Sequence, residues 1–308
     1  MINTIFTVVI VTYNRVSELK KTLGLYEQMI YCPKKLIVVN NASSDETESY
    51  LENWKTKEAS FKKEVITTTE NLGGAGGFSL GMTSALNTDC DFIFLADDDA
   101  YPDPNVFLKL DEFYRNCEVK DEIAGMCTKN INFGNIDCMH RRRVRKNWIA
   151  FKEENIDKDE YLKISFEVDE FSFVGAAIKR SIAKEIGVPL KKYFIYFDDS
   201  EYSLRLRKKG KIICVTNAIM NHNTKPNEKK WGYYYAVRNR LDMVKRHGSK
   251  MNYIYYVILS YMKYCSLLAF LLKWKSFDFI KMCKQAIEDS KKENFGINVK
   301  YPPGKEMK

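Results

Sequence analysis

Four strand-like runs in the first hundred residues constrain the fold of this chain more than any other feature. They occupy residues 6–14, 34–41, 61–71 and 91–96, and three of them contain an uninterrupted apolar block. Such blocks are typical of strands that are buried on both faces of a sheet. The segments between the runs carry apolar residues at helical spacing. The resulting βαβαβαβ order predicts a mostly parallel sheet with helices on both faces.

The second half of the chain is less regular. We expect a helix over 106–117, a strand leading into a helix over 172–187, a helix ended by Gly210 and a strand that ends near His222. From Trp231 onward the sequence is aromatic and its spacing predicts helices. The sequence shows neither an internal repeat nor a low-complexity linker.

Three consecutive aspartates, Asp97, Asp98 and Asp99, follow the fourth strand-like run. Adjacent carboxylates repel one another, and an unpaired buried carboxylate is costly, so the group needs either water or a cation. Because side chains alternate along an extended segment, Asp97 and Asp99 can point the same way while Asp98 turns aside. Two such carboxylates suit Mg²⁺ or Mn²⁺. The alternative is an acidic turn that is solvated or caps the next helix.

Polar clusters also follow the first two runs, at residues 12–14 and 40–44. Ligands of parallel sheets bind at the carboxyl ends of the strands, which meet at one edge. We therefore expect these clusters to converge with the aspartates, which favours a metal site over a solvated turn.

The formal net charge of +9 favours an anionic partner, such as nucleic acid, an anionic membrane or a phosphorylated substrate. A nucleic-acid-binding module is supported by this charge alone and leaves the aspartates unexplained. A sugar-phosphate nucleotidylyltransferase would need a glycine-rich, basic loop after the first strand, which residues 12–19 lack.

The eight cysteines form no Cys-x-x-Cys pair, so they predict neither a zinc site nor a disulfide framework. Reduced cysteines of this kind are typical of a cytosolic protein.

Several segments, in their order and spacing, resemble a family 2 glycosyltransferase with the GT-A fold. Four segments resemble the nucleotide-sugar half of that family: "VVIVTYNR", "LIVVNNASSDET", "ENLGGAGGF" and "FLADDDA". Further along, "YFIYFDDSEYSLRLRKKG" is similar to the motif of the catalytic base, while "NHN" and "WGYYYAVRNR" resemble the galactofuranosyltransferase and rhamnosyltransferase branch. The resemblance covers residues 5–245.

The resemblance implies an α/β fold that is Rossmann-like, with a mostly parallel central sheet and flanking helices, plus a C-terminal helical region. It places the donor-binding half at residues 1–125 and the acceptor and catalytic half of the same domain at residues 126–225. The helical region would then comprise residues 226–308.

The resemblance also implies a set of site residues. A metal ion, Mn²⁺ or Mg²⁺, would be held by Asp97, Asp99 and His222. Asp199 would be the catalytic base beside Asp198. The donor would be bound by Thr12, Tyr13, Asn14, Arg15, Asn40, Asn41, Asn71, Gly73, Gly74, Gly76, Gly77, Asp97 and Asp98. The acceptor would contact Glu201, Trp231 and Arg238. Many family members carry Asp at the position of Asn40, whose amide can still bond the edge of a pyrimidine base.

The expected chemistry is transfer of a sugar from a nucleotide diphosphate. The metal would neutralise the leaving diphosphate, a base would deprotonate the acceptor hydroxyl, and the glycine run would let the backbone approach the donor closely. A single base without a nucleophile implies inversion at the anomeric carbon.

We expect UDP-galactofuranose as donor, with dTDP-rhamnose as the alternative. The acceptor would be a glycan or a polyprenyl-diphosphate-linked glycan of a bacterial surface polysaccharide. We expect no nucleic-acid partner, and a homo-oligomer remains an open alternative.

We expect a cytoplasmic protein that is peripheral at the inner face of the cell membrane. The basic run Arg141–Lys146 would be a solvated face or a contact for lipid phosphates. The aromatic run Tyr253–Leu272 is long enough to span a bilayer, but Lys263 lies in its middle. A buried or surface-lying helix is therefore preferred there, with a spanning helix as the alternative.

Overall fold

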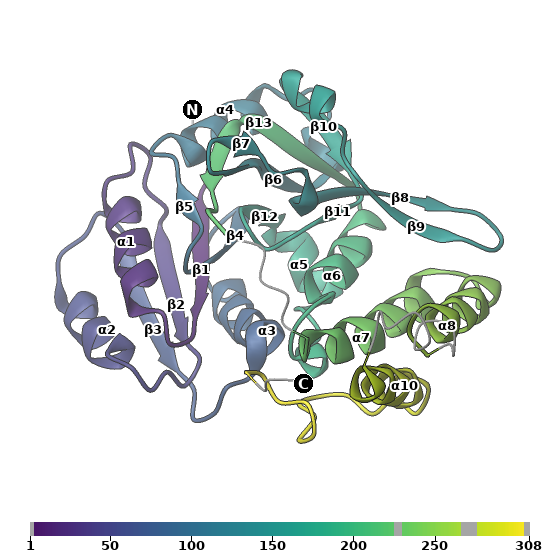
Figure 1. Cartoon of the computed structure of the whole chain (residues 1–308). Coiled ribbons are helices and arrows are strands. Elements are labelled where there is room, and N and C mark those ends of the chain that lie inside the picture. The colour runs from purple at the N-terminus through teal and green to yellow at the C-terminus, as the bar shows by residue number, and fades with distance from the viewer. Residues whose placement is uncertain (1–2, 225–229, 266–275, 305–308) are drawn as a thin grey trace.

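A mixed sheet of ten strands forms the centre of the molecule (Figure 1). The structure is a computed structural model, and it describes residues 3–224, 230–265 and 276–304. The strands of this sheet are β1 (Phe6–Thr12), β2 (Lys35–Asn40), β3 (Lys62–Thr67), β4 (Phe92–Asp97), β5 (Tyr101–Pro102), β6 (Ile123–Asn132), β7 (Asn135–Ile136), β10 (Ser165–Val168), β12 (Ala176–Lys179) and β13 (Lys211–Asn221). A smaller sheet contains β8 (Arg141–Lys146), β9 (Phe151–Asn155) and β11 (Glu170–Phe171).

Helices connect and cover the strands. The α-helices are α1 (Val16–Glu27), α2 (Thr47–Thr56), α3 (Gly73–Leu86), α4 (Val106–Asn116), α5 (Arg180–Ile186), α6 (Asp198–Arg207), α7 (Gly232–His247), α8 (Lys250–Cys265) and α10 (Phe277–Lys291). Short 3₁₀ turns are η1 (Lys120–Glu122), η2 (Cys138–His140), η3 (Lys158–Leu162) and η4 (Lys191–Tyr193).

The strand order of the main sheet is β10-β13-β6-β12-β4-β1-β2-β3. The four strands predicted from the first half, β1 to β4, pair in parallel, as expected of βαβ units. β12 lies antiparallel between β4 and β6, and β13 runs parallel to β6. The predicted boundary after residue 125 falls inside β6, so both halves of the chain share one continuous sheet.

Side chains of β1 alternate between the two faces of the sheet, and all are buried. Val8 and Ile10 belong to the apolar layer shared with α1, α2 and α4, whereas Val9 and Val11 face α3, α5 and α6. The predicted fold class, with helices on both faces, is therefore confirmed. The parallel register places Thr12 opposite Asn40 and Val11 opposite Asp97, so the polar residues that follow β1, β2 and β4 meet at one edge.

The glycines of α3 allow this helix to lie against the sheet. A Cβ atom on Gly77 would lie 2.5 Å from Val11 Cγ1, and one on Gly81 would lie 2.3 Å from Val9 Cγ1. Real side chains do not approach this closely, so any larger residue would push α3 away from β1.

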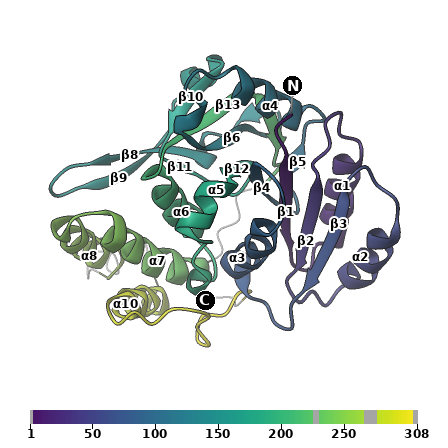
Figure 2. The same ribbon diagram turned by 180° about the vertical axis from the view of Figure 1, so that it is seen from behind.

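The C-terminal helices α7, α8 and α10 form a third apolar cluster beside the body of the protein (Figures 1 and 2). Phe151 of β9 and Leu204 of α6 also contribute to this cluster. The β8–β9 hairpin extends from the body on the same side as α8 in both views. Within the residues that the structure describes, no helix is long and apolar enough to cross a membrane.

Candidate active site

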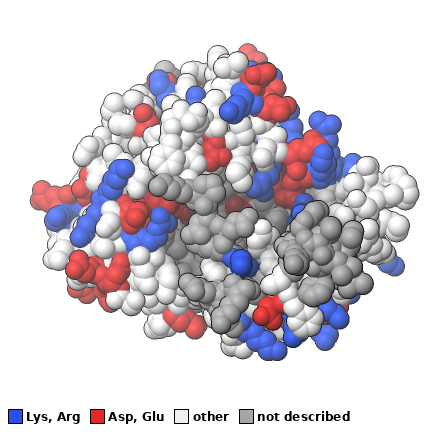
Figure 3. All heavy atoms as spheres, viewed as in Figure 1, with Lys and Arg blue, Asp and Glu red and all other residues white. Residues whose placement is uncertain are grey.

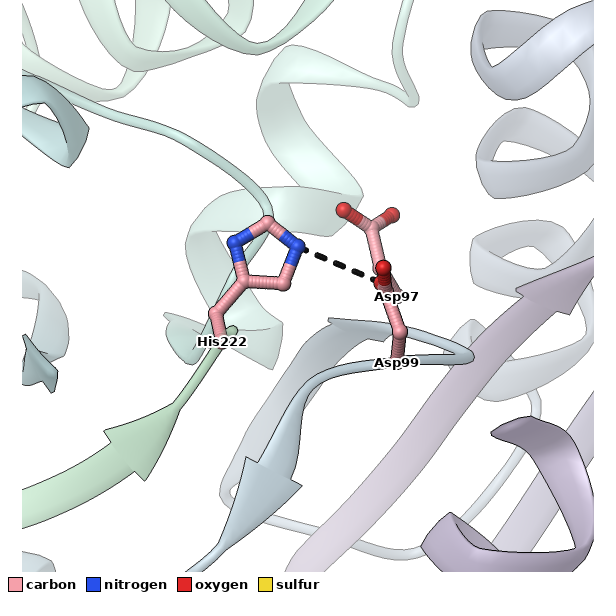
Figure 4. A group of neighbouring side chains, drawn as sticks. All are labelled: Asp97, Asp99 and His222. Atoms are coloured by element: carbon pink, nitrogen blue, oxygen red, sulfur yellow. Dashed lines mark ion pairs between the residues drawn. The ribbon is translucent and has the colours of Figure 1, made fainter. Parts of the chain in front are cut away.

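The three aspartates at the end of β4 point in two directions. Asp98 turns into the protein, where it is only 3% exposed and accepts a hydrogen bond from Thr12 Oγ1 at 2.7 Å. Asp97 and Asp99 face His222, which follows β13 (Figure 4). The Asp99 carboxylate lies 3.2 Å from His222 Nε2, and one ligand atom from each of the three residues lies within 4.8 Å of the others. The structure thus brings together residues that are more than 120 positions apart in the sequence.

Electrostatics at this cluster favour a cation. Burial and the neighbouring Asp99 raise the pKa of Asp97 to about 6. The pKa of Asp99 falls to about 2 because His222 and Arg15 outweigh the effect of burial. Burial opposes protonation of His222, but Asp99 and Asp97 nevertheless raise its pKa. Two carboxylates and one imidazole nitrogen, held close together, fit the ligand preferences of Mn²⁺ and also accommodate Mg²⁺.

His140, which the sequence analysis did not identify, lies behind His222. Its Nε2 atom is 3.4 Å from His222 Nδ1, and its Nδ1 atom is 2.6 Å from Ser172 Oγ. Asp137 approaches the same Nε2 atom at 3.5 Å. If His222 offers Nε2 to a metal, its Nδ1 carries the proton and donates it toward His140. No local sequence signal indicates this contact, because the two histidines are 82 positions apart.

Arg15 links the loop after β1 to the aspartates. Its guanidinium lies 3.1 Å from Asp98 Oδ1 and 2.5 Å from Asp99 Oδ2. Tyr13 is 42% exposed at the edge of the sheet. Asn14 has a positive φ of 52°, and its side-chain oxygen accepts a hydrogen bond from the Ser44 backbone N–H at 2.7 Å. Thr12 and Asp98 are therefore buried supports, whereas Tyr13 and part of Arg15 remain accessible to a ligand.

The asparagines after β2 differ in their surroundings. Asn40 is fully buried, and its Nδ2 atom has no hydrogen-bond partner within the described part of the chain. Asn41 is a structural residue. Its Oδ1 accepts from Leu72 N–H at 2.9 Å, while its Nδ2 donates to Asn71 Oδ1 at 3.1 Å and Gly73 O at 3.0 Å. Asn41 therefore shapes the turn that enters α3.

The glycine run Gly73–Gly77 forms the first turn of α3 and packs closely against neighbouring segments. Gly73, with φ of 71°, would place a Cβ atom 2.0 Å from the Phe194 carbonyl oxygen. A Cβ atom on Gly76 would lie 2.5 Å from Leu72 Cβ, and one on Gly77 would collide with Val11 of β1. Only Gly74 of the four has open space beside it. Close packing within the protein therefore explains why Gly73, Gly76 and Gly77 are glycines, while their predicted approach to the donor stays a prediction.

Asp198 and Asp199 begin α6, directly after a strained backbone segment. Phe194, Tyr196 and Phe197 have φ values of 66°, 67° and 65°. Each such conformation costs about 1–3 kcal/mol for a residue other than glycine, and such strain clusters at functional sites. The segment turns the chain sharply so that both aspartates lie at the start of the helix.

Buried residues of α7 hold this strained segment. The Asn239 amide nitrogen lies 3.0, 2.9 and 2.9 Å from the carbonyl oxygens of Tyr193, Ile195 and Tyr196. Arg238 is only 1% exposed, and its guanidinium donates to the carbonyls of Tyr193 and Gly296. In this structure the guanidinium of Arg238 thus bonds backbone carbonyls inside the protein, and its predicted contact with an acceptor stays a prediction.

Burial raises the pKa of both aspartates at the start of α6. Burial raises the pKa of Asp198 well above the usual range, and the charges of Asp199 and Asp97 add to the effect. Burial also raises the pKa of Asp199, whereas the nearby Arg142 lowers it. Asp199 lines a small pocket together with Arg142, Glu170 and His140. This pocket connects the start of α6 with the histidine pair.

The remaining acceptor assignments fall on packed residues. Glu201 is 1% exposed and pairs with Arg205 at 3.0 Å and His247 at 3.2 Å. Trp231 is 8% exposed and packs edge-on against Tyr235. Both side chains are thus packed inside the protein in this structure, and their predicted contacts with an acceptor stay predictions.

Three arginines of the basic run Arg141–Lys146 have partners within the protein. Arg141 is fully buried, and its guanidinium donates to the carbonyls of Thr128 and Val174, so the expectation of a solvated or lipid-facing side chain is wrong for this residue. Arg143 pairs with Glu160 at 3.0 Å, and Arg145 pairs with Glu154 at 2.7 Å.

Comparisons with known proteins identify the family of the chain. The model of the family "Glycosyl transferase family 2" matches residues 7–187. The galactofuranosyltransferase GlfT1 of Mycobacterium tuberculosis is 30% identical over 220 residues, which is 68% of this chain and 66% of that protein. GlfT1 of Mycolicibacterium smegmatis is 35% identical over 94 residues, or 30% of each chain. The match thus spans slightly less than two thirds of the M. tuberculosis protein and under a third of the M. smegmatis protein.

Solved structures show the same fold. GalNAc-T7 with UDP, GalNAc and Mn²⁺ has a TM-score of 0.63 at 15% identity, and the match covers 95% of this chain and 56% of that one. Staphylococcus aureus TarS 1–349 in complex with UDP-GlcNAc has a TM-score of 0.59 at 14% identity, covering 93% of this chain and 80% of that one. At these identities the likeness establishes the GT-A fold.

Proposed function

The chain belongs to glycosyl transferase family 2, and we propose that it is a metal-dependent inverting galactofuranosyltransferase. It would transfer galactofuranose from UDP-galactofuranose to a glycan or lipid-linked glycan during bacterial surface polysaccharide synthesis. The observation that carries the proposal is the cluster of Asp97, Asp99 and His222 at the sheet edge, in a chain 30% identical to a galactofuranosyltransferase.

The donor would lie along the carboxyl edge of β1, β2 and β4. Asp97, Asp99 and His222 would hold Mn²⁺ or Mg²⁺, which neutralises negative charge on a diphosphate when bound. Asn40 supports recognition of the base, because its amide has no partner among the described residues and lies at the end of β2. Tyr13 and Arg15 flank the same edge and would contact the nucleotide.

The acceptor hydroxyl would be deprotonated by Asp199. Burial raises the pKa of this carboxylate, which makes it a stronger base than an exposed aspartate. Direct displacement with one base and no enzyme nucleophile inverts the configuration at the anomeric carbon. Asp198 lies beside Asp199 and keeps additional negative charge at the start of α6.

We place the enzyme at the cytoplasmic face of the membrane, where it would meet a polyprenyl-diphosphate-linked acceptor. The net charge of +9 supports attraction to such a surface.

Calorimetric titration of UDP tests the metal site. We expect UDP to bind in the presence of Mn²⁺ and to bind much more weakly in EDTA. Asp97→Asn should abolish the dependence on metal, whereas Asp121→Asn, at an exposed position in η1, should leave it intact. Equal UDP affinity with Mn²⁺ and with EDTA would contradict the proposal.

Turnover with competing donors tests the sugar. UDP-galactofuranose and dTDP-rhamnose should be compared with the same acceptor extract, measuring release of the nucleoside diphosphate. Faster turnover of dTDP-rhamnose would assign the chain to rhamnosyl transfer and reject the galactofuranosyl donor.

A further inference from the structure

Helix α8 exposes a row of apolar side chains along one side. The row consists of Met251, Ile254, Tyr255, Ile258, Leu259 and Met262, which are between 36% and 64% exposed. Their spacing of three and four positions places them on one face of the helix. We refer to these six residues as the α8 stripe. Residues 266–272 of the predicted aromatic run lie outside the described residues.

The opposite side of α8 packs against the rest of the protein. Tyr256 is buried and donates a hydrogen bond to the Phe151 carbonyl, and Asn252 Nδ2 donates to the Asn147 carbonyl at 3.0 Å. Tyr253, Val257 and Tyr261 pack against the cluster shared with α7 and α10. These contacts attach the helix to the protein through the side that does not carry the stripe. A helix surface left to water is normally polar, and clustered apolar exposure marks an interaction surface.

The tip of the β8–β9 hairpin extends the same surface. Trp148 at this tip is 71% exposed, and its carbonyl accepts a hydrogen bond from Ser249 Oγ just before α8. Lys146 Nζ donates to the His247 carbonyl at 3.1 Å. Together with the Asn147 and Phe151 contacts, these bonds hold the hairpin tip beside the first turn of α8. In Figure 3 the protruding end formed by these two elements is mostly uncharged.

Basic residues border this apolar surface. Neither α8 nor the segment 141–152 contains a single aspartate or glutamate. Arg145, Lys146, Lys152, Lys250 and Lys263 lie on these two segments. One carboxylate, Glu154, pairs with both Arg145 and Lys152, so it neutralises only part of their charge. The surface therefore combines exposed apolar side chains with an excess of positive charge.

We propose that the α8 stripe and Trp148 dock onto the surface of an anionic lipid bilayer. The apolar side chains would enter the boundary between headgroups and acyl chains, and the bordering lysines would meet lipid phosphates. A second copy of this chain fits less well, because pairing two such surfaces would bring their positive borders together. The inference rests on the proposed function for the location at a membrane, and it adds which face of the protein makes the contact.

Sedimentation with vesicles tests this surface. The full chain should bind vesicles made of equal parts phosphatidylcholine and phosphatidylglycerol, and bind much less to pure phosphatidylcholine or in high salt. The double substitution Ile258→Ser and Met262→Ser should weaken binding about tenfold or more, since both side chains lose their apolar surface. The matched control is Leu162→Ser with Ile164→Ser, which removes two even more exposed apolar side chains, one at the end of η3 and one just before β10.

Two further measurements separate the outcomes. Calorimetric binding of UDP with Mn²⁺ should be the same in the α8 double variant and the wild type, because the stripe lies outside the donor site. If the wild type itself does not bind UDP with Mn²⁺, the proposed function is rejected, but the proposed docking surface is not affected by that result. Equal vesicle binding by the α8 variant and the wild type would overturn the docking surface. A dimer of the wild type that dissociates in the α8 variant, seen by analytical ultracentrifugation, would also overturn it in favour of a contact between copies.

Discussion

At the scale of single residues, the aspartates after β4 differ by the direction in which each side chain points. Asp98 supports the loop through Thr12 and Arg15, whereas Asp97 and Asp99 face His222. The same alternation along an extended backbone would place any pair of residues two positions apart on one side. What makes this pair a candidate metal site is the imidazole that arrives from the end of β13.

Replacing Asp199 with asparagine tests the assignment of the base. We expect Asp199→Asn to lower kcat by several orders of magnitude and leave UDP affinity nearly unchanged, because the base acts on the acceptor. Steady-state kinetics and calorimetry would measure the two effects. If Asp198→Asn is the inactive variant and Asp199→Asn remains active, the assignment of the pair must be reversed.

The pH profile of the enzyme provides a second check on Asp199. A base works when deprotonated, and burial raises the pKa of this carboxyl, so kcat/KM should fall with decreasing pH at a pH above that of an ordinary aspartate. The positive charge of Arg142 lowers the same pKa. Arg142→Gln should therefore shift the acid limb to higher pH. An acid limb that stays at the same pH or moves to lower pH in this variant would argue against Asp199 as the titrating group.

His140 should influence metal affinity through His222. Partners behind a ligating histidine commonly change affinity by about 10–100-fold, so His140→Ala should weaken Mn²⁺ binding by at least about tenfold. Glutamine can still accept the His222 Nδ1 proton, so His140→Gln should recover part of the loss. Mn²⁺ titration followed by electron paramagnetic resonance measures both. Equal affinity in wild type and His140→Ala would show that the contact does not orient His222.

At the scale of elements, the start of α6 depends on α7. The strained segment before α6 has three positive φ values, and the Asn239 amide reaches three of its carbonyl groups. Such strain persists only where surrounding contacts hold it. Helix α7 therefore helps determine where Asp198 and Asp199 lie, although it supplies none of the three residues of the metal cluster.

Removing the Asn239 amide should damage both stability and turnover. Asn239→Ala leaves buried carbonyls without donors, which should lower the free energy of unfolding by about 2–3 kcal/mol. We also expect a lower kcat with nearly unchanged UDP affinity, because Asp199 loses its position. Chemical denaturation and steady-state kinetics measure these effects. Asn87→Ala, which removes an exposed hydrogen bond at the end of α3, is the control, and equal losses in both variants would contradict this explanation.

At the scale of the whole molecule, the candidate site is assembled from both halves of the sheet. β4 contributes the aspartates, β13 leads to His222, and α6 carries the proposed base. The C-terminal helices complete this arrangement through Arg238 and Asn239 rather than forming an independent body.

A truncated chain tests this dependence. A protein ending at residue 224 would lack α7 and expose Phe194 and Leu204, which are buried in the cluster with α7 and α10. We expect it to lose its cooperative thermal transition and its UDP binding. A chain ending at residue 304 should behave as the full protein does, and a truncated chain that still melts cooperatively would show that the helical region is dispensable for folding.

The local sequence pattern was sufficient for the order of the elements and for the residues at the end of β4. Apolar runs and helical spacing are short-range signals, so β1 to β4 and the helices between them follow from the neighbouring residues alone. The Asp97–Asp99 segment was recognisable for the same reason. Residues with long-range partners were not predictable in this way. The sequence predicts ligand contacts for Gly73, Gly77 and Arg238, but it does not reveal that the two glycines pack against Phe194 and Val11 or that Arg238 donates to backbone carbonyls.

Only the tertiary structure decided which charges face the site and which are used inside the protein. Arg141 and Arg143 are two positions apart, but the first is buried among carbonyls and the second pairs with Glu160 at the surface. The contact of His140 with His222 arises because β13 ends next to the turn that begins β8. Such encounters depend on how distant strands are placed in one sheet, and chain-local propensities carry no information about that placement.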